Sequence, residues 1–177
     1  VVRTKASAVA LIGAVTPGTD SRGTTNLATV KIKNVQIEYP QVQAEQTGAS
    51  AGALVGTFEG VTLTVQDALA ENHFRDKLGS STEKAADLKL EEESKYRIRA
   101  LKGTAGGLIG RDSSRSTNVR ENLYYRADSC GTAVGGRTEA SGTAARTTAE
   151  FAGLSFLRQL DKNGCFVLEN GAYPELS

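Results

Sequence analysis

The sequence predicts a mainly β protein in which one β-rich module occurs twice in tandem. Two observations support this prediction: apolar residues alternate along several short segments, and residues 58–66 resemble residues 151–159. Alternation with a period of two buries one face of a β-strand. We therefore expect a tandem-duplicated β-sandwich or a pair of barrel-like halves, with at most one short helix in each half.

The internal repeat sets the predicted domain organisation. Both segments read Phe-x-Gly-apolar-Thr/Ser-apolar-x-x-Gln without a gap, and the pattern Asp-Ser-x-x-x-Thr-Asn occurs at 20–26 and at 112–118. Chance is the alternative, because Gly, Thr, Ser and Ala are frequent enough here to produce short matches. The repeat places a first module at 1–80, a linker at 81–88 and a second module at 89–177, unless both fuse into one pseudo-symmetric domain.

The clearest predicted strand is Ala28–Tyr39, in which apolar residues alternate with one slip near Asn34. Such a slip indicates a β-bulge. Pro40 is expected to end the strand, because proline cannot donate a ladder hydrogen bond. Gly164 is expected in a left-handed turn between two strands of a hairpin. The other predicted strands are 61–67, 88–90, 96–101, 122–126, 154–160 and 165–168.

Two segments have a second interpretation, as short helices rather than strands or loops: Thr64–Leu78 and the alanine-rich Thr138–Phe151. Stretches rich in Gly, Ser and Thr are predicted loops. Long loops in a compact domain are usually functional or disordered, and here we expect them to become ordered against a neighbouring subunit. The predicted loops are 16–25, 45–53, 103–117 and 131–143.

The candidate chemical groups do not form a catalytic motif. Cys130 and Cys165 either form one disulfide or are two unrelated thiols, since no CxxC spacing is present. His73 is the only histidine and lacks a motif partner, and residues 103–110 are glycine-rich without the Lys-Ser of a phosphate-binding loop. We therefore predict no enzyme activity, no catalytic residues, no cofactor and no metal site.

The charge balance argues against nucleic acid and membrane partners. The chain of 177 residues carries 21 basic and 20 acidic residues, a net charge of +1. Nucleic-acid binding is not predicted, because it would need a clustered basic excess. The arginines at 111, 115, 120 and 126 are interpreted as either ligands of a phosphate or carboxylate, or solubilising loop residues. No apolar run reaches the length of a membrane span.

The sequence from Phe166 to Pro174, together with the two Phe-x-Gly segments, is similar to the Greek-key motifs of the βγ-crystallins. That resemblance implies paired antiparallel modules. The spacing from Phe-x-Gly to Gly-x-Tyr is about twice too long, and the aromatic corner is missing, so the likeness assigns no function.

Self-assembly is the function that a duplicated β-module favours, because two fused copies reproduce in one chain the arrangement of a symmetric dimer. We expect a structural subunit of a virion, a tail tube or an extracellular filament, located outside the cell or in a virion. Its loops and strand edges would contact copies of itself or other subunits of an assembly. The alternatives are a secreted binding or adhesion module and an accessory scaffold or linker subunit. The chain begins with Val1 and has no Met, which fits either removal of an initiator Met or cleavage of a leader.

Overall fold

The computed structural model is mainly β, as the sequence predicted. It describes residues 2–4, 8–9, 11–26, 29–38, 40–60, 62–71, 97–113, 119–138, 140–151, 159, 164, 166–167 and 175–176. No helix within these ranges has the length and apolar character needed to cross a membrane.

The strands wind into stacked rungs, each of which contributes one strand to each of several parallel sheets. The first rung contains β1 (Val2–Thr4), β2 (Ala8–Val9), β3 (Ile12–Val15) and β6 (Thr29–Glu38). The second contains β7 (Val42–Ala44), β8 (Ser50–Gly52), β9 (Val55–Glu59) and β10 (Thr62–Glu71). The third contains β11 (Ile98–Ala100), β12 (Thr104–Gly106), β13 (Ile109–Ser113) and β14 (Val119–Arg126). The partial fourth rung contains β15 (Thr143–Arg146) and a bridge at Val134.

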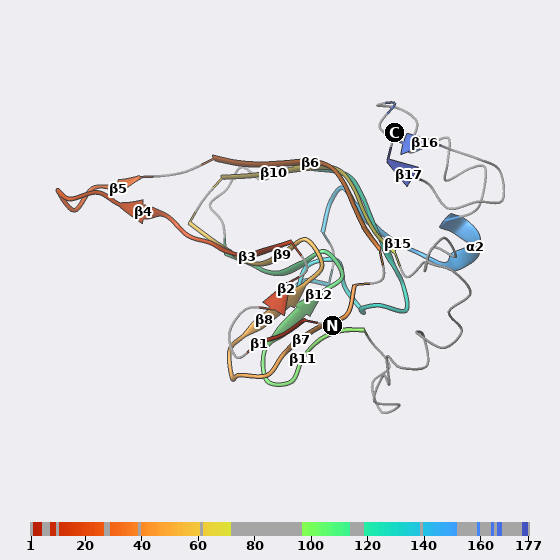
Figure 1. Ribbon diagram of the computed structural model, residues 1–177, viewed down its shortest axis with the longest axis horizontal. Helices are drawn as coiled ribbons and strands as arrows, with labels where there is room; N and C mark the ends of the chain where they lie inside the picture. Colours follow the sequence, from red (N-terminus) through yellow and green to blue (C-terminus); the bar gives the residue numbers. More distant parts are fainter. Residues whose placement is uncertain are drawn as a thin grey trace.

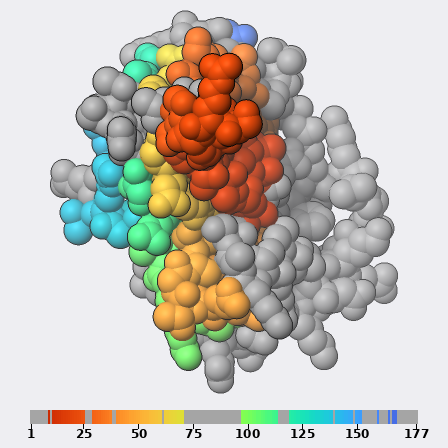
Figure 2. All heavy atoms as spheres, turned by 90° about the vertical axis from the view of Figure 1, so that its left-hand side faces the viewer, coloured from red at the N-terminus to blue at the C-terminus, as the bar shows by residue number. Residues whose placement is uncertain are grey.

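Every contact between neighbouring rungs is a parallel pairing, so the described architecture is a short parallel β-solenoid. The sheets run in the orders β1-β7-β11, β2-β8-β12, β3-β9-β13 and β6-β10-β14-β15. Figure 1 looks along the stack, so strands of successive rungs nearly overlap. Figure 2 looks from the side, and the rungs follow one another from red through yellow and green to blue.

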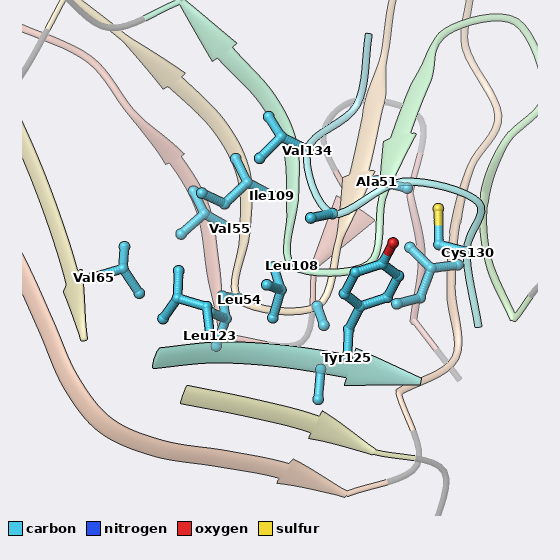
Figure 3. Close-up of a cluster of buried hydrophobic side chains, with 14 of the residues drawn as sticks. Ala51, Leu54, Val55, Val65, Leu108, Ile109, Leu123, Tyr125, Cys130 and Val134 are labelled. Carbon is cyan, nitrogen blue, oxygen red and sulfur yellow. The ribbon is translucent and has the colours of Figure 1, made fainter. Parts of the chain in front are cut away.

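A short sequence repeat, different from the predicted one, underlies this stack. Residues 8–13, 51–56 and 105–110 read Ala-Val-Ala-Leu-Ile-Gly, Ala-Gly-Ala-Leu-Val-Gly and Ala-Gly-Gly-Leu-Ile-Gly. The structure stacks them in register, with Ile12 on Val55 and Val55 on Ile109, and Val134 continues the row. Figure 3 shows Val55, Ile109 and Val134 side by side in the core.

The glycines of this repeat permit the close approach of neighbouring rungs. A Cβ at Gly52 would overlap the backbone oxygen of Val55 and approach Gly110 N at 2.5 Å. A Cβ at Gly110 would lie 2.6 Å from the backbone oxygen of Gly56. These corners therefore accept only glycine at native spacing, which is the close-approach use of this residue.

The interior of the stack is filled by one apolar cluster with contributions from every rung. The largest fully buried side chains include Phe58, Leu54, Leu63, Leu108 and Leu123. Leu54 and Leu108 lie one above the other in successive rungs, so the apolar layer of one rung covers that of the next. The core is therefore continuous across the predicted linker, because β7 to β10 pair directly with β11 to β14.

A second, smaller apolar cluster lies on the outer face of the long sheet. Leu69 and Tyr124 project there and pack with Phe151 of α2 (Thr148–Phe151) and Phe166 of β16 (Phe166–Val167). The helix begins with a capping box. Thr147 N donates to Glu150 Oε2 at 2.8 Å, and Glu150 N donates to Thr147 Oγ1 at 3.3 Å.

The tandem-duplicated sandwich or barrel is not confirmed. Phe58 lies in strand β9, whereas its predicted counterpart Phe151 ends helix α2. Asp20 lies at an exposed turn, whereas its counterpart Asp112 is a buried strand residue. The predicted linker 81–88 lies outside the described residues, so these domain boundaries stay a prediction.

Three of the four predicted loops were wrong, because they contain strands. Residues 16–25 include the antiparallel hairpin of β4 (Gly18–Thr19) and β5 (Thr25–Asn26), which projects from the stack (Figure 1). Residues 45–53 contain β8, and 103–117 contain β12 and β13. Small residues mark tight solenoid corners here, where backbones nearly touch, rather than flexible loops.

The helix alternatives were mostly wrong. Residues 62–71 form strand β10, and residues 72–78 lie outside the described residues. Residues 143–146 form β15, so only 148–151 are helical among the described residues of Thr138–Phe151. Gly164 has the predicted left-handed φ of 61°. Beyond it, β16 pairs antiparallel with β17 (Glu175–Leu176). The antiparallel Greek-key pairing implied by the crystallin resemblance is absent from the described rungs, which pair in parallel.

Candidate functional site

A row of left-handed residues crosses the long sheet at its bend. Asn34, Asp67 and Asn122 have φ values of 54°, 54° and 59°, and Gly142 has 73°. They occupy equivalent positions in successive rungs, since the residues beside them pair in register. We call this row the polar ladder. It accounts for the break in alternation at Asn34, because Asn and Asp tolerate left-handed φ better than other side chains. The predicted β-bulge is not what breaks the alternation, because the strands pair one residue to one here.

The polar ladder is joined by hydrogen bonds between side chains. Asn122 Nδ2 donates to Asp67 Oδ1 at 2.8 Å, and the Tyr124 hydroxyl donates to Asn122 Oδ1 at 3.0 Å. Asp67 is buried. A buried carboxylate needs such partners, because an unsatisfied one would cost several kcal/mol.

A shallow pocket of about 310 Å³ lies beside the ladder on the outer face of β14. It is lined by Tyr124, Arg146, Glu121, Asn122, Gly142, Thr143 and Ala144. The Arg146 guanidinium carbon lies 5.4 Å from the centre of the Tyr124 ring, which is a cation–π distance. The pocket therefore offers a cation, a carboxylate, an amide and hydroxyls, a set suited to a polar ligand.

The pocket does not contain an activated nucleophile. Burial raises the pKa of the Tyr124 phenol, while Arg146 lowers it and Asp67 raises it further. The phenol is therefore a proton donor at neutral pH rather than a base. Glu121 already accepts a hydrogen bond from Gln66 Nε2 at 2.9 Å. Within the described ranges, no three His, Cys, Asp or Glu residues come together as a metal site.

A buried ion pair interrupts the apolar core of the third rung. Arg120 Nη2 bonds to Asp112 Oδ2, and their side chains are only 7% and 0% exposed. In the second rung, Phe58 is in register with Asp112, and Val65 is in register with Arg120. Arg137 Nη2 also donates to the backbone oxygen of Asp112 at 3.3 Å. The third rung thus carries charge where the second carries only apolar side chains.

A hollow of about 380 Å³ lies at the fourth-rung end of the stack. Its lining consists of Tyr125 and small residues, namely Ala133, Thr138, Ala140, Ser141, Thr143, Ala144 and Ala145. Thr143 stands in register with Leu123 of the third rung, and Ala145 with Tyr125. The last rung therefore has smaller side chains than the rung beneath it, and this difference leaves the hollow.

The opposite end of the stack is apolar and only partly covered. Ile12, Val15, Val30, Val35 and Ile37 of the first rung are partly buried. Their register partners in the second rung are Val55, Phe58, Leu63, Ala68 and Ala70, all fully buried. The first-rung end of the solenoid therefore exposes apolar surface to solvent.

Of the two cysteines and the histidine singled out from the sequence, only Cys130 lies within the described residues. Cys130 is buried in the core, and burial raises the pKa of its thiol, while backbone N–H groups of Thr132 and Gly131 lower it. Cys165 and His73 lie outside the described residues, so the disulfide stays a prediction. The glycine-rich segment 103–110 forms β12, a corner and the start of β13, so its interpretation as a flexible loop was wrong.

The predicted arginine group separates. Arg120 lies in the interior, Arg126 Nη2 bonds to Asp128 Oδ2 at 2.8 Å, and Arg111 is exposed on β13. Arg115 lies outside the described residues. The sequence did not reveal the polar ladder, although the slip at Asn34 marked its first member.

Comparisons with known proteins add no relative. No family model, no curated protein and no solved structure matches this chain.

Proposed function

We propose that this chain is a structural assembly subunit, which associates through the open ends of its β-solenoid. The observation that supports the proposal most directly is the contrast in burial between the first two rungs. Val15 and Val30 are partly exposed, whereas Phe58 and Leu63, which stack on them, are fully buried. A further rung placed over the first would bury this apolar surface, just as the first rung buries the apolar side chains of the second.

The strand edges support the same proposal. Strands β1, β2, β3 and β6 stand at one edge of their sheets, and β15 stands at the other edge of the long sheet. An edge strand presents unpaired N–H and C=O groups, which can pair with another chain. Assembly in a virion, a tail tube or an extracellular filament uses such contacts, and that location stays a prediction.

Sedimentation velocity over a wide range of concentration tests this proposal. We expect the mass to rise with concentration above that of one chain. Val15→Asp at the first-rung edge should weaken this association, whereas Val119→Asp should leave it unchanged. Val119 is a suitable control because it is 48% exposed and its side chain lies on the outer face of β14. A single monomeric species at every concentration would overturn the proposal.

A binding module is the second candidate, favoured by the pocket beside Tyr124. Its mixture of donors and acceptors suits a hydroxyl-rich ligand such as a saccharide. Titration with a panel of neutral and acidic oligosaccharides would support this function if one saturates and Arg146→Ala weakens it. Assembly without saturable binding would leave the structural function as the better account.

A further inference from the structure

We propose that copies of this chain stack head to tail, with Leu11 of one copy entering the hollow at the fourth-rung end of the next. This inference rests on the proposed function and specifies which surfaces meet. It concerns a second copy of the chain, because one end of the molecule presents an exposed leucine and the other has a hollow lined mostly by small residues.

A vertical column of side chains carries the argument. The corner residues Leu11, Leu54, Leu108 and Ala133 occupy one position in successive rungs. Ile12 N donates to Leu54 O at 3.0 Å, Leu54 N to Leu108 O at 2.8 Å, and Leu108 N to Ala133 O at 3.0 Å. Leu54 and Leu108 are fully buried, as Figure 3 shows. The column thus reads Leu, Leu, Leu, Ala from the first rung to the fourth.

The two ends of this column differ in a complementary way. Leu11 is 49% exposed, so the first rung presents a large apolar side chain to solvent. Ala133 lines the hollow of about 380 Å³ at the other end, where a leucine would continue the column. A second copy stacked on the fourth rung supplies that leucine and covers its own first-rung edge at the same time.

The buried ion pair does not oppose this stacking. Desolvating an exposed charge would cost several kcal/mol. However, the side chains of Asp112 and Arg120 are already 0% and 7% exposed within one molecule. A further rung above them therefore removes little additional water from charged atoms. The contact is heterologous, so repeated stacking produces an open filament rather than a closed dimer.

The first test uses substitutions at both ends. Leu11→Asp places a charge at the tip of the column, and Ser141→Trp fills the mouth of the hollow from an exposed position. We expect each to weaken association at least about tenfold in sedimentation velocity. Val119→Asp is the control for Leu11→Asp, since both residues are about half exposed and lie on different faces. Unchanged association for both end variants would overturn the inference.

The second test identifies the contact directly. In a Cys130→Ala, Cys165→Ser background, Leu11→Cys and Ala145→Cys proteins are prepared separately, mixed and treated with a short bis-maleimide cross-linker. Head-to-tail stacking predicts a cross-linked dimer that contains one of each protein. Cross-linking within the Leu11→Cys protein alone would indicate head-to-head contact and overturn the inference, while the proposed function would stand. Monomeric wild-type protein would instead reject the proposed function. Thermal unfolding of each variant verifies that it folds.

Discussion

The side-chain amide of Asn122 donates to Asp67 Oδ1 at 2.8 Å, and both residues hold a left-handed backbone conformation at equivalent positions of neighbouring rungs. Each left-handed residue shifts the alternation of its strand, so that Val65 and Ala68 both face the core. The hydrogen bond between the two side chains holds the left-handed residues of neighbouring strands in register.

The polar ladder yields a stability prediction at Asp67. Asp67→Ala should lower the free energy of unfolding by about 2–3 kcal/mol, because it removes a buried acceptor and the side chain that tolerates a positive φ. Asp67→Asn should retain most of the stability, since Asn keeps both properties. Urea unfolding measures the difference, with Lys33→Ala as the exposed control. Equal loss from the Ala and Asn variants would refute the role of the ladder.

Gly142 is predicted to be intolerant of any side chain. A Cβ there would overlap the backbone oxygen of Arg120 in the neighbouring rung, in addition to the strain of a φ of 73°. Gly142→Ala should cost more than about 2 kcal/mol. Gly136→Ala is a matched control, because Gly136 has a φ of 78° but its nearest neighbour, Thr104 Cγ2, would lie at 3.7 Å. That control should cost only about 1 kcal/mol in thermal or urea unfolding.

The ion pair of the third rung predicts strong coupling between Asp112 and Arg120. Asp112→Ala should destabilise by about 3–5 kcal/mol, because it leaves the guanidinium buried without its carboxylate. Replacing the pair with Phe and Val, the residues at these positions in the second rung, should recover most of the loss. A double-mutant cycle in urea measures the coupling. Additive effects of the two single changes would contradict the prediction.

Tyr124 is predicted to make stability fall at alkaline pH. Burial raises the pKa of its phenol, so the folded state holds this proton more tightly than the unfolded state. The associated stability is complete below the ordinary phenol pKa of about 10 and is lost as pH rises through the raised value. Tyr124→Phe should cost about 1 kcal/mol at neutral pH through the lost bond to Asn122.

The pH dependence of urea unfolding checks this prediction. The gap between wild type and Tyr124→Phe should shrink from pH 8 to pH 11, because only the wild type loses the contribution of this phenol. Parallel curves over that range would show that Tyr124 titrates normally.

The strand content and the break in alternation at Asn34 were predictable, because alternation and its interruption are local signals. Strand β6 also ends before Pro40, as predicted. The direction of pairing was not predictable in this way, since parallel partners lie far apart in the sequence. For example, Leu63 pairs with Val30, and Gln66 with Lys33.

The true repeat was missed for a physical reason. The core of a solenoid rung needs only a short conserved corner, Ala-x-x-Leu-Ile/Val-Gly, whereas the connections between corners vary freely. The first rung contains an inserted hairpin, and the second and third rungs are separated by residues 72–96. These unequal intervals hide the repeat in the sequence. The longer Phe-x-Gly match instead aligns Phe58, which lies in a strand, with Phe151, which lies in a helix. The polar ladder and the hollow form only where rungs stack on one another. The residue pattern along a single strand carries no information about that stacking.

The hairpin β4–β5 has a consequence for how such a chain can diversify. It enters between β3 and β6, yet β3 still pairs with β9 and β6 with β10 in register. The pairing between rungs is therefore unaffected by the hairpin inserted at this corner. Recognition properties can therefore be gained or exchanged at this corner by insertion, while the strands that pair between rungs stay unchanged.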